Sequence, residues 1–522
     1  MPHGQPHVLL HAHRGDVVTT TTREQFDALL PTHRVVPVVR ELLADTETPV
    51  GVYRKLAVDR PGSFLLESAE QGVWNRFSFV GVSSFGQLTA DEGAVTWRSH
   101  GLSLERLLGD DVERSPLETV AHVLERWRTP RVPGLPRLTG GLVGHVGWEA
   151  VRELEHLPNA PRREVDVPAI GLSFVSELVV LDHRTGTALL IATALADGVD
   201  DADDLWAQAQ GRLDDLQALL AEDAPAWLAE PLADVEPSPT ASVTPDGFAA
   251  MVERAKEHIV DGDVFQVVLS SRFDVPLDAH PLDVYRVLRL LNPSPYLYLL
   301  TLEDASGKPY QVVGSSPEAL VTVHEGTATM HPIAGSRPRG SDAAADNALA
   351  DELLADPKER SEHVMLVDLA RNDLAKVCAA GSVAVTEFMV VERFSHIMHI
   401  VSTVEGRMRD DASAVDAFRA TFPAGTLSGA PKPRALEIID ALEPAQRGVY
   451  GGVVGYFDFA GDADLAIAIR TVTIVDGVAH VQAGAGLVAD SVPATEHAEV
   501  RSKAAAPLRA TVRADAMRRI QR

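Results

Sequence analysis

Two Glu-x-x-Glu pairs stand in the second half of the 522-residue chain: Glu359 with Glu362, and Glu496 with Glu499. Each pair lies in a segment whose pattern predicts a helix, where residues three apart share one face. Adjacent carboxylates repel each other, so such a face needs solvent, a basic partner or a cation. Two such faces could together bind Mg²⁺, which prefers oxygen ligands and keeps several waters. An isolated pair is more often a solvated surface feature, and both interpretations stay open on the pairs alone.

Three segments rich in glycine and small residues accompany these pairs, at positions 332–340, 423–432 and 482–486. Small residues let backbone N–H groups approach a ligand closely, and N–H groups with hydroxyls bind carboxylates well. None of the three matches a P-loop or a dinucleotide fingerprint, which argues against nucleotide binding. Any one of them could be an ordinary turn, but three beside two acidic helices predict a site for a small anion.

Composition excludes several classes of function. The formal net charge of −27 argues against nucleic acids and anionic membranes, which attract basic proteins, but not against a small anion in a local basic pocket. The single cysteine, Cys378, excludes intrachain disulfides and multi-cysteine metal sites. The chain shows neither a signal peptide nor a long uncharged apolar run, and we expect a cytoplasmic protein.

The chain length favours two domains. Residues 222–244 are rich in alanine, proline and acidic residues, and we place a linker there. This predicts a disordered histidine-containing tail at 1–20, an N-terminal domain at 21–221 and a second domain at 245–522. In the N-terminal domain we expect a hairpin formed by 63–68 and 76–81 and a helix at 204–221.

The second domain should alternate strands and helices. Thr244, Pro245 and Asp246 predict a helix start, and the helix should run to about Asp261. Asp476-Gly477 is the strong signal of a type I′ hairpin turn. We expect glutamate-bearing helices at 351–377 and 494–517, the latter with Pro507 inside. A strand should run over 393–405, with Ile397, His399 and Val401 on one face and His396 on the other. The strands of the hairpin should be 464–475 and 478–482.

These motifs closely resemble the chorismate-utilising enzymes, in particular component I of anthranilate synthase. The resemblance is nearly continuous from about 244 to the C-terminus and patchier over 51–182, and it is strongest over 356–373, 425–432 and 482–486. It implies an α+β fold of large, mainly antiparallel sheets flanked by helices. It also implies an N-terminal regulatory domain and a C-terminal catalytic domain that acts on chorismate.

Two positions bear on which reaction the chain catalyses. Relatives that add water to chorismate carry a base-forming lysine where this chain has Gln266, and glutamine suits ammonia, which is already a nucleophile. Aminodeoxychorismate synthases usually carry a nucleophilic lysine where this chain has Ala334. The resemblance therefore implies direct attack by ammonia, giving anthranilate and pyruvate by way of aminodeoxyisochorismate, the first step of tryptophan biosynthesis.

The same resemblance assigns roles to single residues. Mg²⁺ would bridge the ring carboxylate of chorismate to Glu362 and Glu499, with Glu359 and Glu496 completing the acidic shell. Ser336 departs from the usual threonine, which keeps the hydroxyl and loses a methyl group. The implied substrate-binding residues are Gly335, Ser336, Tyr450, Arg470, Gly484, Ala485, Gly486 and Lys503, and Thr426 and Gln266 join the catalytic set.

Two further residues would move protons. Glu318 resembles the general acid for the departing ring hydroxyl, which requires a raised carboxyl pKa. His399 resembles the histidine of the second step, the elimination of pyruvate. Taken alone, a histidine on an apolar strand face is usually a packed core residue, and Arg470 beside Ile469 could be a surface arginine.

The source of ammonia must lie outside this chain. A glutaminase needs a cysteine on a strained turn with a partner histidine, and Cys378 follows a helix instead. We therefore expect a separate glutamine amidotransferase subunit, a hetero-oligomer, and replacement of that subunit by free ammonium salts.

The N-terminal hairpin resembles the tryptophan feedback site of the family. The matching residues are Leu66, Glu67 and Ser68, with Pro295, Tyr296 and Leu297 meeting them from the second domain. A plain hairpin packed on that domain is the alternative. His145 and Trp148 depart from the tyrosines usual in the family, and the sequence gives no functional reason for this.

Two competing functions stay open. An aminodeoxychorismate or aminodeoxyisochorismate synthase would stop before pyruvate loss, and product analysis separates it from the first interpretation. A non-catalytic tryptophan-sensing scaffold would only bind the amidotransferase, and a turnover assay with ammonium tests it.

Overall fold

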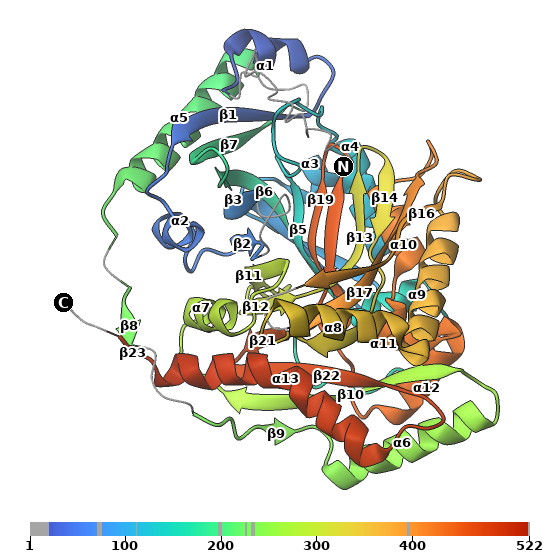
Figure 1. Cartoon of the computed structure of the whole chain (residues 1–522). Helices are drawn as coiled ribbons and strands as arrows, with labels where there is room; N and C mark the ends of the chain where they lie inside the picture. Colours follow the sequence, from blue (N-terminus) through green and yellow to red (C-terminus); the bar gives the residue numbers. More distant parts are fainter. Residues whose placement is uncertain are drawn as a thin grey trace, which may run out of the picture.

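The computed structural model describes residues 20–69, 76–110, 112–196, 201–224, 227–230, 235–393 and 397–519. Over these ranges the chain is an α+β protein with a large, mainly antiparallel sheet and helices around its outside (Figure 1). The predicted fold class is confirmed. The histidines of the predicted tail and His396 lie outside the described residues. Among the described helices, none has both the length and the apolar character needed to cross a membrane.

The N-terminal half contributes long central strands and covering helices of 5 to 20 residues. The predicted hairpin is present, since β2 pairs antiparallel with β3. In chain order the elements are α1 (Arg23–Leu29), β1 (Val35–Leu43), α2 (Pro49–Leu56), β2 (Phe64–Glu67), β3 (Phe77–Asp91), β4 (Ala94–Ser99), α3 (Leu104–Leu108), α4 (Pro116–Arg126), β5 (Gly141–Val146), the short 3-10 helix η2 (Trp148–Glu153), β6 (Ile170–Asp182), β7 (Thr187–Leu195) and α5 (Ala202–Ala221).

The C-terminal half carries the longer helices and most of the predicted site. Its elements begin with two very short strands, β8 (Ala229–Glu230) and β9 (Thr240–Ala241). They continue with α6 (Pro245–Val260), β10 (Gln266–Pro276), α7 (Pro281–Leu291), β11 (Tyr296–Glu303), β12 (Pro309–Ser316), β13 (Ala319–His324), β14 (Thr327–Met330), β15 (Ile333–Pro338), α8 (Ala343–Ala355), α9 (Pro357–Ala375), β16 (Ala384–Arg393), β17 (Ile397–Arg407), α10 (Ala414–Thr421), α11 (Gly425–Ser428), β18 (Gly429–Ala430), α12 (Lys432–Leu442), β19 (Val453–Asp458), β20 (Ala463–Ile467), β21 (Thr471–Val475), β22 (Val478–Leu487), α13 (Pro493–Ala516) and β23 (Arg518–Arg519).

Strands from the two halves pair directly with each other. β2 lies beside β11, with Glu67 opposite Leu297, and β5 lies beside β19 (Figure 1). The core is also shared, because the Phe174 ring of β6 contacts both Trp127 and Phe459, at centroid distances of 5.6 and 4.7 Å. The predicted linker contains β8 and β9, which pair with β23 and β10. The division into two domains stays a prediction.

Helix starts follow the capping residues. The Thr244 side chain accepts from the Gly247 N–H and Pro245 takes the first helical position, so α6 starts where the sequence predicts. The single helix predicted over 351–377 is wrong, because α8 ends and α9 begins at Asp356. Asp356 has an extended backbone before Pro357, and its side chain caps the first turn of α9. This new start places Glu359 in the first turn.

Two predicted strands also differ. The strand expected at 393–405 begins at Ile397, since Arg393 ends β16, and alternation alone cannot show where a hairpin reverses. The strand expected at 464–475 is two strands, β20 and β21. Arg470 lies between them with φ +53°, so its placement within a strand is wrong. The Asp476-Gly477 turn is confirmed, with positive φ at both residues.

Candidate active site

A cavity of about 570 Å³ lies between the two glutamate helices and the sheet. Its walls come from α9 and α13, from β15, β17 and β22, and from the short α11 turn. Most of the predicted site residues line it, although they are spread over nearly 190 positions of sequence. These are Glu318, Gly335, Ser336, Glu359, Glu362, His399, Thr426, Tyr450, Arg470, Gly484, Glu499 and Lys503.

Four predicted residues are not among the described residues that line this cavity: Gln266, Ala485, Gly486 and Glu496. Gln266 lies directly against Gly486, where an added Cβ would come 2.5 Å from Gln266 Nε2. Ala485 is fully buried, and Glu496 lies one turn before Glu499 on α13. The roles expected for these residues stay predictions.

Glu318 lines the cavity in an environment that is unusual for an acid. Protein atoms surround it on all sides apart from the opening to the cavity, and this burial raises its pKa to about 7. Thr426 donates a hydrogen bond of 3.1 Å to Glu318 Oε1, and Lys503 and Arg470 lie near, which all oppose the rise. A carboxyl with this pKa holds a proton about half of the time near pH 7, as a general acid requires.

His399 faces the same cavity from β17, with its tautomer set by Gly335. Its Nδ1 lies 3.0 Å from the Gly335 carbonyl oxygen, which can only accept, so Nδ1 carries the proton and Nε2 carries the lone pair. Burial lowers the pKa of His399 and keeps the ring neutral. The arrangement presents a base.

Gly335 makes this contact through its backbone conformation. Its φ is +66°, and the β15–β17 register shifts between Ala334 and Ser336, which marks a β-bulge. An added Cβ would lie 3.0 Å from both Glu359 and Leu353. Glycine is therefore needed both for the bend and for the close approach of α9.

Arg470 supplies positive charge to the cavity from a strained position. It is buried, and within the described ranges its guanidinium forms no ion pair with the protein. Burial lowers its pKa, although the nearby Glu318 and Glu499 charges oppose this. A non-glycine residue with φ +53° costs roughly 1–3 kcal/mol and is typical of functional sites. This buried cation is suited to a carboxylate ligand.

Tyr450 and Lys503 complete the basic side of the cavity around Gly484. An added Cβ at Gly484 would come 2.8 Å from the Tyr450 hydroxyl, so glycine leaves room for the phenol. Lys503 Nζ donates to the Gly484 carbonyl at 3.1 Å and pairs with Glu499 at 2.7 Å. Lys503 therefore links the basic side of the cavity to the carboxylate of Glu499.

Three of the four predicted metal ligands meet at the acidic end. Burial, followed by the charges of Glu359 and Glu499, raises the pKa of Glu362. Glu359 lies 3.4 Å from Arg337 and Glu499 lies 2.7 Å from Lys503. Over the described residues no group of three or more His, Cys, Asp or Glu side chains has the arrangement of a formed metal centre. The mutual repulsion at Glu362 is what a divalent cation with oxygen ligands would relieve, so this donor set fits Mg²⁺.

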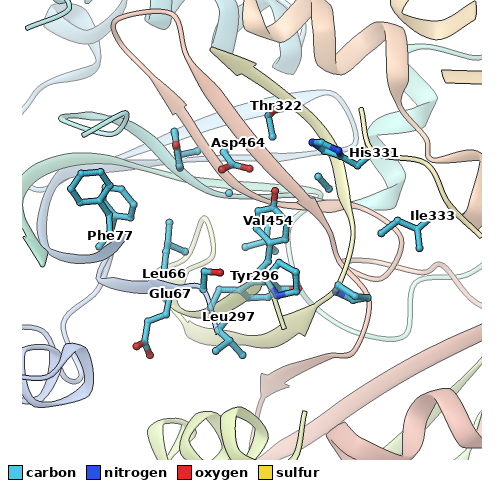
Figure 2. A pocket seen from close by; sticks show the side chains of 18 of the residues that line it. Leu66, Glu67, Phe77, Tyr296, Leu297, Thr322, His331, Ile333, Val454 and Asp464 are labelled. Carbon is cyan, nitrogen blue, oxygen red and sulfur yellow. The ribbon is translucent and has the colours of Figure 1, made fainter. Parts of the chain in front are cut away.

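A second cavity of about 200 Å³ adjoins the first, and Figure 2 shows side chains that line it. All six residues predicted for tryptophan line it: Leu66, Glu67, Ser68, Pro295, Tyr296 and Leu297. Pro295, Pro317 and Ile333 line both cavities. The two cavities therefore share part of a wall.

The resemblance implies that Glu67 or Ser68 takes the amino group of tryptophan, and the structure shows where the polar groups of this cavity lie. The Glu67 carboxylate accepts from the Tyr285 hydroxyl and lies beside Arg289 of α7, and in Figure 2 it points away from Tyr296 and Val454. Asp464 faces the cavity instead, and its buried Oδ1 has no hydrogen-bond partner in the described part of the chain. Burial raises the pKa of Asp464 to about 6.

Several residues that line the cavities were not predicted as site residues, among them Gln482, Ile333 and Asp464. Gln482 is the first residue of the 482–486 segment, so its position was a usable signal. Asp464 stands in the mainly apolar strand β20, and only the fold brings it into the wall of the same cavity as Ser68. No local pattern could have found it.

A model of the family described as chorismate binding enzyme matches residues 62–509. Anthranilate synthase component 1 of Arthrobacter globiformis is 52% identical over 503 residues, which cover 95% of this chain and 94% of that protein. Its counterpart in Mycobacterium tuberculosis is 48% identical over 507 residues, with 96% and 98% covered. The crystal structure of anthranilate synthase component I from Streptococcus pneumoniae superimposes with a TM-score of 0.71 at 34% identity, covering 90% of this chain and 99% of that one.

Proposed function

The chain belongs to the chorismate binding enzyme family, and we propose that it is the large subunit of an anthranilate synthase. The reaction would convert chorismate and ammonia to anthranilate, pyruvate and water. The observation that carries this proposal is the pairing, in one cavity, of a protonatable carboxyl at Glu318 with a neutral histidine at His399. The two groups have the opposite protonation states that a proton-donating step and a proton-removing step require.

The first step replaces the ring hydroxyl by an amino group. Ammonia forms the new C–N bond, the ring double bonds shift, and the C–O bond to the hydroxyl breaks. Hydroxide is a poor leaving group, so Glu318 donates a proton to it and water departs. The Thr426 hydroxyl holds the Glu318 carboxyl at the cavity wall, where the ring would lie.

The second step removes pyruvate and makes the ring aromatic. His399 Nε2 takes the proton from the ring carbon that carries nitrogen, and the ether C–O bond breaks. The enolpyruvyl fragment gains a proton and leaves as pyruvate. Because Nδ1–H is held by the Gly335 carbonyl, the imidazole keeps the orientation and tautomer that this proton transfer needs.

The two carboxylates of chorismate would bind at opposite ends of the cavity. Arg470, Tyr450 and Lys503 form the basic end for the enolpyruvyl carboxylate. Glu359, Glu362 and Glu499 would hold Mg²⁺, with Glu496 reached through water, and the ion would neutralise and orient the ring carboxylate. A metal explains how three glutamates and an anionic substrate share one end of a cavity.

Ammonia would come from a separate glutamine amidotransferase subunit. Cys378 is buried, pairs through its backbone with Met408, and has a thiol pKa raised by burial. A glutaminase nucleophile needs a thiolate in an accessible turn, which is the opposite environment. Free ammonium should therefore drive the purified chain without its partner.

We also propose that the second cavity binds L-tryptophan as a feedback inhibitor. Tyr296, Leu297 and Leu66 supply apolar walls for an indole, while Ser68 and Asp464 supply polar partners. Thermal unfolding with and without tryptophan tests this. We expect the melting temperature to rise with tryptophan concentration and the rise to shrink in Asp464→Asn; equal shifts in both proteins contradict the site.

An ammonium-driven product assay tests the catalytic proposal. Purified chain with chorismate, Mg²⁺ and ammonium should form fluorescent anthranilate. A stable non-aromatic amino product would favour an aminodeoxychorismate or aminodeoxyisochorismate synthase. Chorismate left untouched would favour a sensor that has lost catalysis.

A further inference from the structure

Arg447 and Glu443 form an ion pair behind the wall of the active-site cavity. Arg447 Nε and Nη2 lie 2.9 and 2.7 Å from the two Glu443 carboxylate oxygens, and the side chains are 1% and 2% exposed. Removing two charges from water is costly, and a buried pair is retained only when further hydrogen bonds satisfy it. The partners of those further hydrogen bonds show what the pair holds.

The remaining guanidinium contacts are to carbonyls of the cavity wall. Arg447 donates to the Leu427 carbonyl at 2.7 Å and to the Val268 carbonyl at 2.8 Å. Leu427 and Val268 both line the active-site cavity. Leu427 directly follows Thr426, whose hydroxyl contacts Glu318. One guanidinium thus holds two backbone segments of the cavity wall, and one of them carries the Thr426 that contacts the catalytic acid.

The carboxylate of the pair reaches a third part of the wall. Glu443 Oε1 accepts from both the N–H and the hydroxyl of Ser270, each at 2.8 Å. The Ser270 hydroxyl in turn accepts from Gln482 Nε2 at 2.9 Å. Gln482 lines the cavity from β22, two residues before Gly484. The hydrogen bonds of the pair therefore reach β10, α11 and, through Ser270, β22.

Two aromatic rings lie close to the Arg447 guanidinium. The Arg447 guanidinium carbon lies 4.2 Å from the Trp148 ring centroid and 5.7 Å from that of Tyr450. The backbone N–H of Trp148 donates to the Gly448 carbonyl, so the N-terminal half is anchored at the same point. The ring contact with Arg447 gives a structural reason for Trp148, which departs from the family's usual tyrosine.

We propose that Arg447 and Glu443 are positioning residues that set the relative places of Thr426, Tyr450 and Gln482 around the substrate. The inference rests on the proposed function, because the reaction is what makes these positions matter. Neither side chain reaches the cavity itself, so both act through the groups they hold. A misplacement of about 1 Å in a catalytic group can cost about 100-fold in rate.

The test compares Arg447→Lys with a matched arginine elsewhere. Lysine keeps the charge but cannot reach Glu443 and two carbonyls at once. We expect kcat to fall about 100-fold with a smaller change in KM, and the alkaline limb of the pH profile to move. The control is Arg131→Lys, which loosens an ion pair with buried Asp462 away from the cavity and should lower the melting temperature without moving that limb.

The outcomes separate this inference from the proposed function. Folded Arg447→Lys with wild-type kcat and pH profile overturns the positioning role. If that variant does not fold, Glu443→Gln, which keeps the side-chain shape, decides: a lower kcat with a shifted limb supports the role, and wild-type behaviour overturns it. If wild-type protein makes no anthranilate, the proposed function fails, and chorismate affinity of wild type and Arg447→Lys by calorimetry still tests the positioning, with equal affinities overturning it.

Discussion

Thr426 Oγ1 donates a 3.1 Å hydrogen bond to Glu318 Oε1 in the wall of the active-site cavity. The contact stabilises the charged carboxylate, while burial favours the neutral acid. Burial prevails, and the pKa of Glu318 reaches about 7. Burial therefore sets the acidity of the group that would protonate the leaving hydroxyl, and the Thr426 hydroxyl limits the rise.

Removing this hydroxyl should move the pH profile in a defined direction. The protonated form of Glu318 is the active one, so kcat/KM should fall as pH rises through about 7. Thr426→Val removes a contact that lowers the pKa, so the alkaline limb should move to higher pH. Thr421→Val is the control, because its hydroxyl donates only to helix carbonyls. If the alkaline limb does not move in Thr426→Val, the limb does not report the titration of Glu318.

The same carboxyl should make stability depend on pH. Its folded pKa of about 7 exceeds the ordinary value of 4.5, so the native state binds more protons between these values and stability falls as pH rises through this window. Glu318→Gln removes the charge. The free energy of unfolding of the variant, relative to that of wild type, should therefore increase between pH 4.5 and 7 by on the order of 2 kcal/mol. Urea unfolding at several pH values measures this, and a pH-independent difference contradicts it.

Replacing His399 should separate the two chemical steps. His399→Gln keeps a side chain in the cavity but supplies no base, so chorismate should disappear while pyruvate release falls by 100-fold or more. Chromatography should reveal a non-aromatic amino compound. His324→Gln, on β13 and paired with Asp462, is the control with normal release. If the variant slows both steps equally, His399 acts in substrate binding and not in the second step.

The magnesium dependence of a Glu499 variant should show whether this carboxylate helps to hold the ion. Glu499→Gln removes one of the charges that repel Glu362, so Mg²⁺ should bind at least tenfold more weakly in calorimetry with chorismate present. Glu437→Gln, a surface carboxylate paired with Arg434, should match wild type. An unchanged magnesium titration in Glu499→Gln removes this residue from the metal shell.

Tryptophan inhibition should depend on Ser68 and leave catalysis intact. Ser68→Arg places a long cation in the second cavity, so tryptophan should no longer inhibit while the ammonium-driven rate stays within twofold. Ser99→Arg, on an exposed part of β4, keeps inhibition. Inhibition of Ser68→Arg at the wild-type tryptophan concentration is the contrary result.

Local signals in the sequence predicted the elements that local chemistry determines. The Thr244 cap, the Asp476-Gly477 turn and the 64–67 strand all form where expected. The break at Pro357 was also readable, because proline follows a capping aspartate there, yet the continuous helical pattern obscured it. Most of the active-site residues that the family resemblance singled out line one cavity.

Long-range geometry could not be predicted in the same way. Arg470 takes a left-handed conformation between two strands, which alternation cannot reveal. Glu67 lines the second cavity, but its carboxylate contacts Tyr285 and Arg289 of α7, which follow over 200 positions later in the sequence. The Arg447–Glu443 pair reads as an ordinary helix-end pair until the fold places three wall segments around it.

The central claim is that one cavity adds ammonia to chorismate and then expels pyruvate. The most direct measurement supplies ¹⁵N-ammonium, chorismate and Mg²⁺ to the purified chain and quantifies both products. We predict anthranilate that carries one ¹⁵N atom, with one pyruvate released per anthranilate. A labelled product that keeps its enolpyruvyl group, or chorismate that remains unchanged, would contradict the account.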